Sequence, residues 1–126
     1  LVAVLTEKLA ECSNVSICKP LFNLASYMAS FDFLLMPSRF EGLSILSLEA
    51  SFNGLPAIIN ACPGLYETLP EDWPLRVENN DINQYIHLFS DVLPTINRQH
   101  LKDMARRFAD EHFSMRSMRA GYERLY

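Results

Sequence analysis

Between Asp32 and Asn60, an apolar run, a glycine turn, a helix-like stretch and a second apolar run follow one another, and this order constrains the fold more than any other part of the chain. The run at 32–36 predicts the central strand of a sheet. Positions 45–53 have the pattern of a helix, which Gly54 should end, with a proline just beyond. The run at 56–60 then predicts a buried strand parallel to the first.

The same alternation continues on both sides of this unit. Apolar residues at helical spacing predict a helix near 2–12, and 14–18 has the pattern of a short strand. A helix entered through Pro20 should follow at 21–28, and 74–79 should form a last short strand. A short helix is also expected near 65–69. Four strands alternating with helices predict an α/β fold with a parallel, doubly wound, Rossmann-like sheet.

The last third of the chain should be helical. Asp81 is the expected N-cap of one helix, and Ser114 should begin the last one. The apolar side chains of these helices are predicted to form packing faces, and exposure of the final stripe would imply a missing partner; they are Ile82, Tyr85, Ile86, Phe89, Leu101, Met104, Ala105, Phe108, Met115, Met118, Tyr122 and Leu125. Residues 1–126 are therefore expected to form a single domain whose sheet is incomplete.

Two carboxylates bracket the turn after the 32–36 strand. Glu41 should lie in the turn, and Glu49 follows on the helix, at the edge of the sheet where open α/β folds bind ligands. A carboxylate is an acceptor that can hold two adjacent hydroxyls at once, which suits a polyhydroxylated ligand. A helix start at Gly42, Leu43 and Ser44 would present unpaired N–H groups to a diphosphate.

A simpler interpretation of the same two acids remains open. If both were helical, eight positions would place them about 80° apart around the axis, so they converge only if Glu41 lies in the turn. Glu41 would otherwise be a solvated acid near a helix N-terminus, and Glu49 a surface acid.

The residues around these acids resemble a known family. The matching stretches are Pro37-Ser38-x-x-Glu41-Gly42, Leu48-Glu49-Ala50 and Gly54-x-Pro56. They are similar to the C-terminal, donor-binding domain of the GT-B-fold retaining glycosyltransferases of the glycosyl transferases group 1 family. The resemblance runs from about Asp32 to Tyr126. It implies that this chain is the C-terminal part of a nucleotide-sugar-binding domain.

The resemblance also implies roles for individual residues. Glu41 would be the catalytic-site acid that holds hydroxyls of the donor sugar, and Glu49 would bind the ribose. Gly42, Leu43 and Ser44 would meet the phosphates through their backbone, although many relatives have a second glycine where this chain has Ser44.

The next loop offers one more candidate contact. Gly64 and Glu67 match in outline a glycine loop and a following glutamate of the family, whereas Cys62-Pro63 departs from it. Gly64 could contact the ligand or simply supply the turn after a proline.

By the same resemblance, the full protein would be a retaining hexosyltransferase-type enzyme. It would move a sugar from a nucleotide-sugar, which is a substrate and not a cofactor, to a glycan or glycolipid acceptor bound through an N-terminal domain. No metal is implied. The chain begins at Leu1 without a methionine, which fits an excised domain. The basic Arg and Lys pair that grips donor phosphates in relatives has no counterpart here, so the isolated chain is expected to be inactive.

Two other classes of function stay open. A non-catalytic nucleotide-sugar-binding or docking module could retain both glutamates without turnover. A receiver-like regulatory domain would share the fold, but it should carry acids at the end of an early strand, whereas Asp32 begins its strand.

Composition excludes some partners. The net charge is −4 and the pI is about 5.3, so nucleic acid is not expected to bind. Five arginines near the C-terminus are interpreted as solvated helix faces, with peripheral contact to an anionic membrane as the alternative; they are Arg106, Arg107, Arg116, Arg119 and Arg124.

Cysteine usage bears on the compartment. The three cysteines, Cys12, Cys18 and Cys62, follow no disulfide or metal-ligand spacing and predict reduced, partly buried thiols in a cytoplasmic protein. A catalytic thiol at Cys62 is disfavoured, because every histidine lies in the helical C-terminal third.

Overall fold

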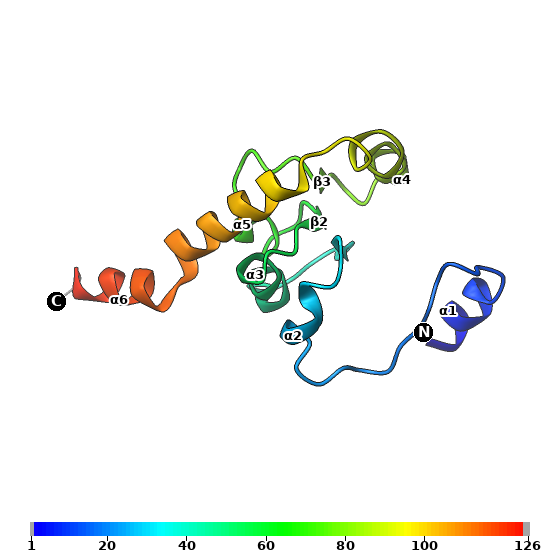
Figure 1. Ribbon diagram of the computed structural model, residues 1–126, viewed down its shortest axis with the longest axis horizontal. Coiled ribbons are helices and arrows are strands. Elements are labelled where there is room, and N and C mark those ends of the chain that lie inside the picture. The colour runs from blue at the N-terminus through cyan, green and yellow to red at the C-terminus, as the bar shows by residue number, and fades with distance from the viewer. Residues whose placement is uncertain (1, 125–126) are drawn as a thin grey trace.

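A three-stranded parallel sheet lies at the centre of the computed structural model, which describes residues 2–124 (Figure 1). Its strands, in spatial order, are β1 (Leu34–Met36), β2 (Ala57–Asn60) and β3 (Arg76–Val77). Leu34 pairs with Ala57 across the first ladder, and Ile59 pairs with Arg76 across the second. The predicted α/β fold with a parallel sheet is confirmed.

Helices lie on both faces of this sheet. The helical elements of the described chain are α1 (Val2–Leu9), α2 (Ala25–Met28), α3 (Ile45–Phe52), η1 (Tyr66–Thr68), α4 (Ile82–His87), η2 (Leu88–Val92), α5 (Arg98–Phe113) and α6 (Met115–Glu123), of which α1 and α6 extend away from the sheet. Successive residues of a strand point to opposite faces. Leu34 packs against the same small apolar cluster as Leu46 of α3, whereas Leu35 lines a groove with Ile86 of α4. Figure 1 accordingly shows α4 across the sheet from α3.

The core centres on β2. All four of its residues are buried, as expected for a parallel strand covered on both faces. The indole of Trp73 donates a 2.8 Å hydrogen bond to the carbonyl of Ala57 and so closes one flank of the strand. Helix α5 packs along α3, and its buried Leu101 and Ala105 belong to the same core cluster as β2 and Trp73. The buried strand predicted at 56–60 is confirmed.

Local capping sets the ends of the helices. The side chains of Ser44, Asp81 and Ser114 each accept a backbone N–H in the first turn of α3, α4 and α6. These contacts satisfy N–H groups that a helix start leaves without partners. Gly54, with a φ of +68°, ends α3 in the left-handed conformation that glycine adopts readily. The stop at Gly54 and the caps at Asp81 and Ser114 are as predicted.

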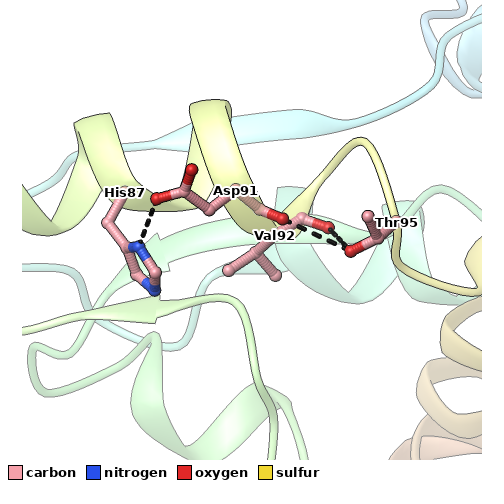
Figure 2. Close-up of polar contacts among 4 residues, drawn as sticks. All are labelled: His87, Asp91, Val92 and Thr95. Carbon is pink, nitrogen blue, oxygen red and sulfur yellow. Dashed lines mark hydrogen bonds and ion pairs between the residues drawn. The ribbon is translucent and has the colours of Figure 1, made fainter.

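Helix α4 continues into the wider helical turn η2, and polar side chains make hydrogen bonds along η2 and just after it (Figure 2). The hydroxyl of Thr95 donates to the carbonyls of Asp91 and Val92, at 3.3 and 3.2 Å. Nδ1 of His87 lies 2.8 Å from a carboxylate oxygen of Asp91, one turn further on. The two bonds from Thr95 satisfy carbonyl groups at the helix end, where the chain turns toward α5.

The N-terminal prediction is partly wrong. Helix α1 is present, but 14–18 forms no strand, and the helix expected at 21–28 shrinks to α2. Asn23 has a left-handed φ of +57°, which interrupts the helix, and Phe22 is 96% exposed. Figure 1 shows α1 apart from the sheet, joined to α2 by an extended stretch. A strand needs a neighbour for its backbone hydrogen bonds, and 14–18 pairs with no other segment among the described residues.

The 32–36 strand was predicted to be central, and this is wrong. Only 34–36 is extended and paired, and within the described chain β1 lies at the edge of the sheet. The central strand is β2, which pairs on both sides. The last predicted strand also shortens, from 74–79 to the two residues of β3.

Several predicted packing faces are exposed. On α4 and η2, Ile82, Ile86 and Phe89 are exposed, and on α6 so are Met115, Met118 and Tyr122, with Met115 at 78%. Figure 1 shows α6 leading away from the sheet, so little of the described chain is near enough to cover it. The prediction of partly buried thiols is wrong for Cys12 and Cys18, which are exposed, whereas Cys62 is buried. Leu125 lies outside the described residues.

Candidate functional site

Glu41 lies in the loop between β1 and α3, at the carboxyl end of the sheet. Its side chain is partly buried, and its Oε1 accepts a 2.8 Å hydrogen bond from the hydroxyl of Ser38. The structure therefore places Glu41 in the turn and not on the helix, as the sequence predicts. A second carboxylate oxygen, and further lone pairs on the first, are available to a ligand.

Gly64, in the loop after β2, packs closely against the loop that carries Glu41. It has a φ of +85°, and a Cβ placed on it would come within 1.5 Å of the carbonyl oxygen of Gly42 and 2.4 Å of that of Glu41. Two backbone hydrogen bonds join the same loops: Glu41 N–H donates to Pro63 at 3.3 Å, and Ser44 N–H donates to Gly64 at 3.1 Å. Glycine at position 64 thus lets two backbones approach closely.

Of the backbone N–H groups just before α3, one is already hydrogen-bonded within the described chain and two have no hydrogen bond there. Ser44 caps the helix with its hydroxyl, and its own N–H is already taken by Gly64. No hydrogen bond is recorded within residues 2–124 for the N–H groups of Gly42 and Leu43, and both residues are exposed. A Cβ on Gly42 would meet no atom within 4 Å, so the backbone here is open to a ligand.

Glu49 is on the exposed side of α3. It shares that side with Ile45, one turn earlier, which is 68% exposed. Among the described residues its carboxylate has no recorded hydrogen bond or ion pair, and no recorded contact joins it to Glu41. The structure therefore brings Glu41, Gly42, Ser44 and Gly64 together by direct contacts, while Glu49 remains a free acid on the helix.

Sequence reasoning missed an amide network that joins the ends of all three strands. Asn60, the last residue of β2, donates from its side chain to the carbonyl of Ser38 and accepts from the N–H of Asn80, each at 2.8 Å. The side chain of Asn80 donates to Pro37 at 3.1 Å and accepts from the hydroxyl of Tyr85 at 2.8 Å. The Asn79-Asn80 pair after a short strand was a turn signal, but its distant partners were not visible in the sequence.

Comparison with known proteins decides the family. Residues 3–94 match the family described as Glycosyl transferases group 1. The chain belongs to the glycosyl transferases group 1 family. The match runs from α1 to just beyond η2, so it contains Glu41, Glu49 and Gly64, whereas α5 and α6 lie outside it.

One curated relative of this glycosyltransferase family chain is described as an uncharacterized 41.2 kDa protein in the cps region of Klebsiella pneumoniae. The two are 30% identical over 105 residues. The aligned part covers 82% of this chain and 29% of the relative, so the chain spans less than a third of that protein's length.

Cys62 and Glu67 of this glycosyltransferase family chain lie in and just after the loop that contains Gly64. Cys62 is buried, and burial, followed by the nearby Glu41 carboxylate, raises the pKa of its thiol. A raised pKa disfavours the thiolate form of Cys62. Glu67 accepts a 2.7 Å hydrogen bond from the N–H of Gly64, so it stabilises the loop.

None of the helices between residues 2 and 124 has both the length and the apolar character to cross a membrane.

Proposed function

We propose that this chain supplies part of the donor site of a GT-B-fold retaining glycosyltransferase, as the C-terminal part of its nucleotide-sugar-binding domain. The full protein would transfer a hexose from a nucleotide-sugar to a glycan or glycolipid. Membership of the glycosyl transferases group 1 family supports sugar transfer in general. The GT-B fold, the retaining outcome and the donor site are the proposed refinements.

One observation carries the proposal: contacts within the chain itself hold the turn with Glu41 in place. Gly64 packs on the backbone of Glu41 and Gly42, and Ser38 holds one oxygen of the Glu41 carboxylate. A polar group fixed in advance binds better, because less conformational freedom is lost on binding.

In this proposal each group has one task. Glu41 holds hydroxyls of the donor sugar, and Glu49, which has no partner of its own in the described chain, is available to the 2′,3′-diol of the ribose. The exposed N–H groups of Gly42 and Leu43 face the diphosphate, helped by the positive end of the α3 dipole. Gly64 contributes indirectly, because its close contact with the backbone of Glu41 and Gly42 fixes the position of the loop that binds the ligand.

The chemistry follows from these positions. As the glycosidic bond of the donor breaks, negative charge grows on the leaving phosphate, and fixed N–H donors stabilise that charge without a metal ion. An acceptor would be bound by an N-terminal domain. The relative in a cps region supports a role in glycan assembly. We propose a cytoplasmic protein, with peripheral membrane contact through the exposed arginines of α5 and α6 as its link to a lipid acceptor.

A binding titration tests the donor site. We would titrate the chain with UDP, GDP, ADP and their sugar conjugates by NMR or calorimetry, and repeat this with Glu49→Ala and Glu41→Gln. One nucleotide should saturate the chain, and Glu49→Ala should weaken it about tenfold or more, as expected when a charged hydrogen bond is lost. Glu41→Gln should weaken only the sugar conjugate. Glu111→Ala, which removes an exposed acid of α5, is the control.

The outcomes separate the alternatives. Equal nucleotide affinity for the Glu49→Ala variant and the unaltered chain would refute the ribose role. If a folded chain binds none of the nucleotides, the chain alone lacks a competent donor site, and the same titration of the full-length protein with and without Glu49→Ala then decides whether this chain contributes to one. Nucleotide binding together with no transfer by the full-length protein would support a non-catalytic module.

A further inference from the structure

A polar hollow lies beside the loop that carries Glu41, at the carboxyl end of β2. It has a volume of about 330 Å³ and is lined by Arg39, Asn60, Asn79 and Asn80. Three of these residues are asparagines and the fourth is a cation, so none of the lining residues carries a carboxylate. Ser38 links the hollow to Glu41, because its hydroxyl donates to Glu41 while its carbonyl accepts from Asn60.

The floor of the hollow is structural. The side-chain amides of Asn60 and Asn80 each use both their oxygen and their nitrogen within the network that joins the strand ends. Their remaining capacity for a ligand is small. They therefore hold the loops after β1, β2 and β3 at fixed positions around the hollow.

The side chains at the rim of the hollow, Arg39 and Asn79, have no recorded hydrogen-bond partner within the described chain. Arg39 is exposed, and within the described chain its guanidinium has no recorded hydrogen bond or ion pair. Asn79 is also exposed, and its side chain is equally without a recorded partner there. Asn79 and Asn80 have φ values of +53° and +52° in a turn closed by the N–H of Asp81 and the carbonyl of Glu78. Outside glycine this conformation is uncommon, and asparagine tolerates it best.

We propose that this hollow binds an anionic group of the substrate, a phosphate or a carboxylate, through Arg39 and Asn79. Arginine offers a planar fork of donors that matches both anions, and the Asn79 amide can add a neutral donor. None of the residues that line the hollow has a carboxylate that could neutralise the Arg39 guanidinium, so its positive charge is available to a ligand anion. The inference rests on the proposed function for its substrate, because it places the anion next to the sugar held by Glu41.

Two sources would provide such an anion: the donor diphosphate, or a carboxylate or phosphate on an anionic saccharide acceptor. We would measure binding of pyrophosphate, glucuronate and neutral glucose to the chain by NMR titration. The variants are Arg39→Gln, Arg39→Lys and Asn79→Gly, since glycine keeps the left-handed turn while it removes the amide. Arg107→Gln removes an equal charge from an exposed position on α5 and is the matched control.

Arg39→Gln should weaken binding of at least one anion about tenfold or more, with Arg39→Lys in between and Arg107→Gln unchanged. Competition between that anion and a nucleotide would identify the donor diphosphate as its source, whereas simultaneous binding would identify an anionic acceptor. Anion binding that is equal in the Arg39→Gln and Arg107→Gln variants, or absent, overturns the proposal. The donor site can fail separately: it fails if Glu49→Ala has no effect on nucleotide binding, whatever Arg39 does.

Discussion

Replacing Gly64 with alanine should break the junction between the two loops that carry the candidate site. The new Cβ would come within 1.5 Å of the carbonyl oxygen of Gly42. No side chain can rotate to relieve this contact, because both partners are backbone. The loops must therefore separate, and the two hydrogen bonds that join them, from Glu41 to Pro63 and from Ser44 to Gly64, should be lost.

The size of the effect can be worked from these contacts. A φ of +85° costs an alanine roughly 1 to 2 kcal/mol relative to glycine. Each lost hydrogen bond adds about 1 kcal/mol. The free energy of unfolding should thus fall by about 3 to 4 kcal/mol, which for a domain of this size lowers Tm by roughly 10 to 15 °C. Urea denaturation followed by circular dichroism would measure it.

Gly42→Ala is the matched control in the same site. A Cβ on Gly42 would meet no atom within 4 Å, so its unfolding free energy should stay within about 0.5 kcal/mol of the unaltered chain. The new methyl group should still weaken nucleotide binding, because it occupies the open backbone surface. If Gly64→Ala unfolds within about 1 kcal/mol of the unaltered chain, the close approach at Gly64 is not what holds the loops, and the reasoning fails.

Four further predictions concern the helix cap, the reactivity and the titration of the buried thiol, and activity. Ser44→Ala removes the side chain that accepts from Ser47 and should lower the free energy of unfolding by about 1 kcal/mol in the same urea assay; no change would show that the cap contributes nothing. Burial raises the pKa of Cys62, so at pH 7 iodoacetamide should modify Cys12 and Cys18 first. Because the raised pKa favours the neutral thiol in the folded state, stability should fall as pH rises above the unfolded thiol value of about 8.5, and a Cys62→Ala variant should lose that slope. The 126-residue chain alone should transfer no sugar in a radiolabelled donor assay, and detectable transfer would contradict this.

Local signals were enough to predict much of the fold. The glycine stop at Gly54, the cap at Asp81 and the buried run that became β2 depend on residues within a few positions of one another, where capping and hydrophobic spacing act. The placement of Glu41 in a turn followed in the same way, because Gly42 and the strand before it are its neighbours in sequence.

Other features depended on partners far apart along the chain. The close approach of Gly64 to Gly42 and the bonds between Asn60 and Asn80 join segments about 20 residues apart, and β1 is an edge strand because only β2 pairs with it in the described chain. Local patterns also predicted a strand at 14–18, which is wrong because strand formation requires a partner. By itself, the sequence determined which segments favour helix, strand or turn. Only the tertiary structure decided which of them meet, because backbone contacts between distant segments leave no periodic trace in the chain.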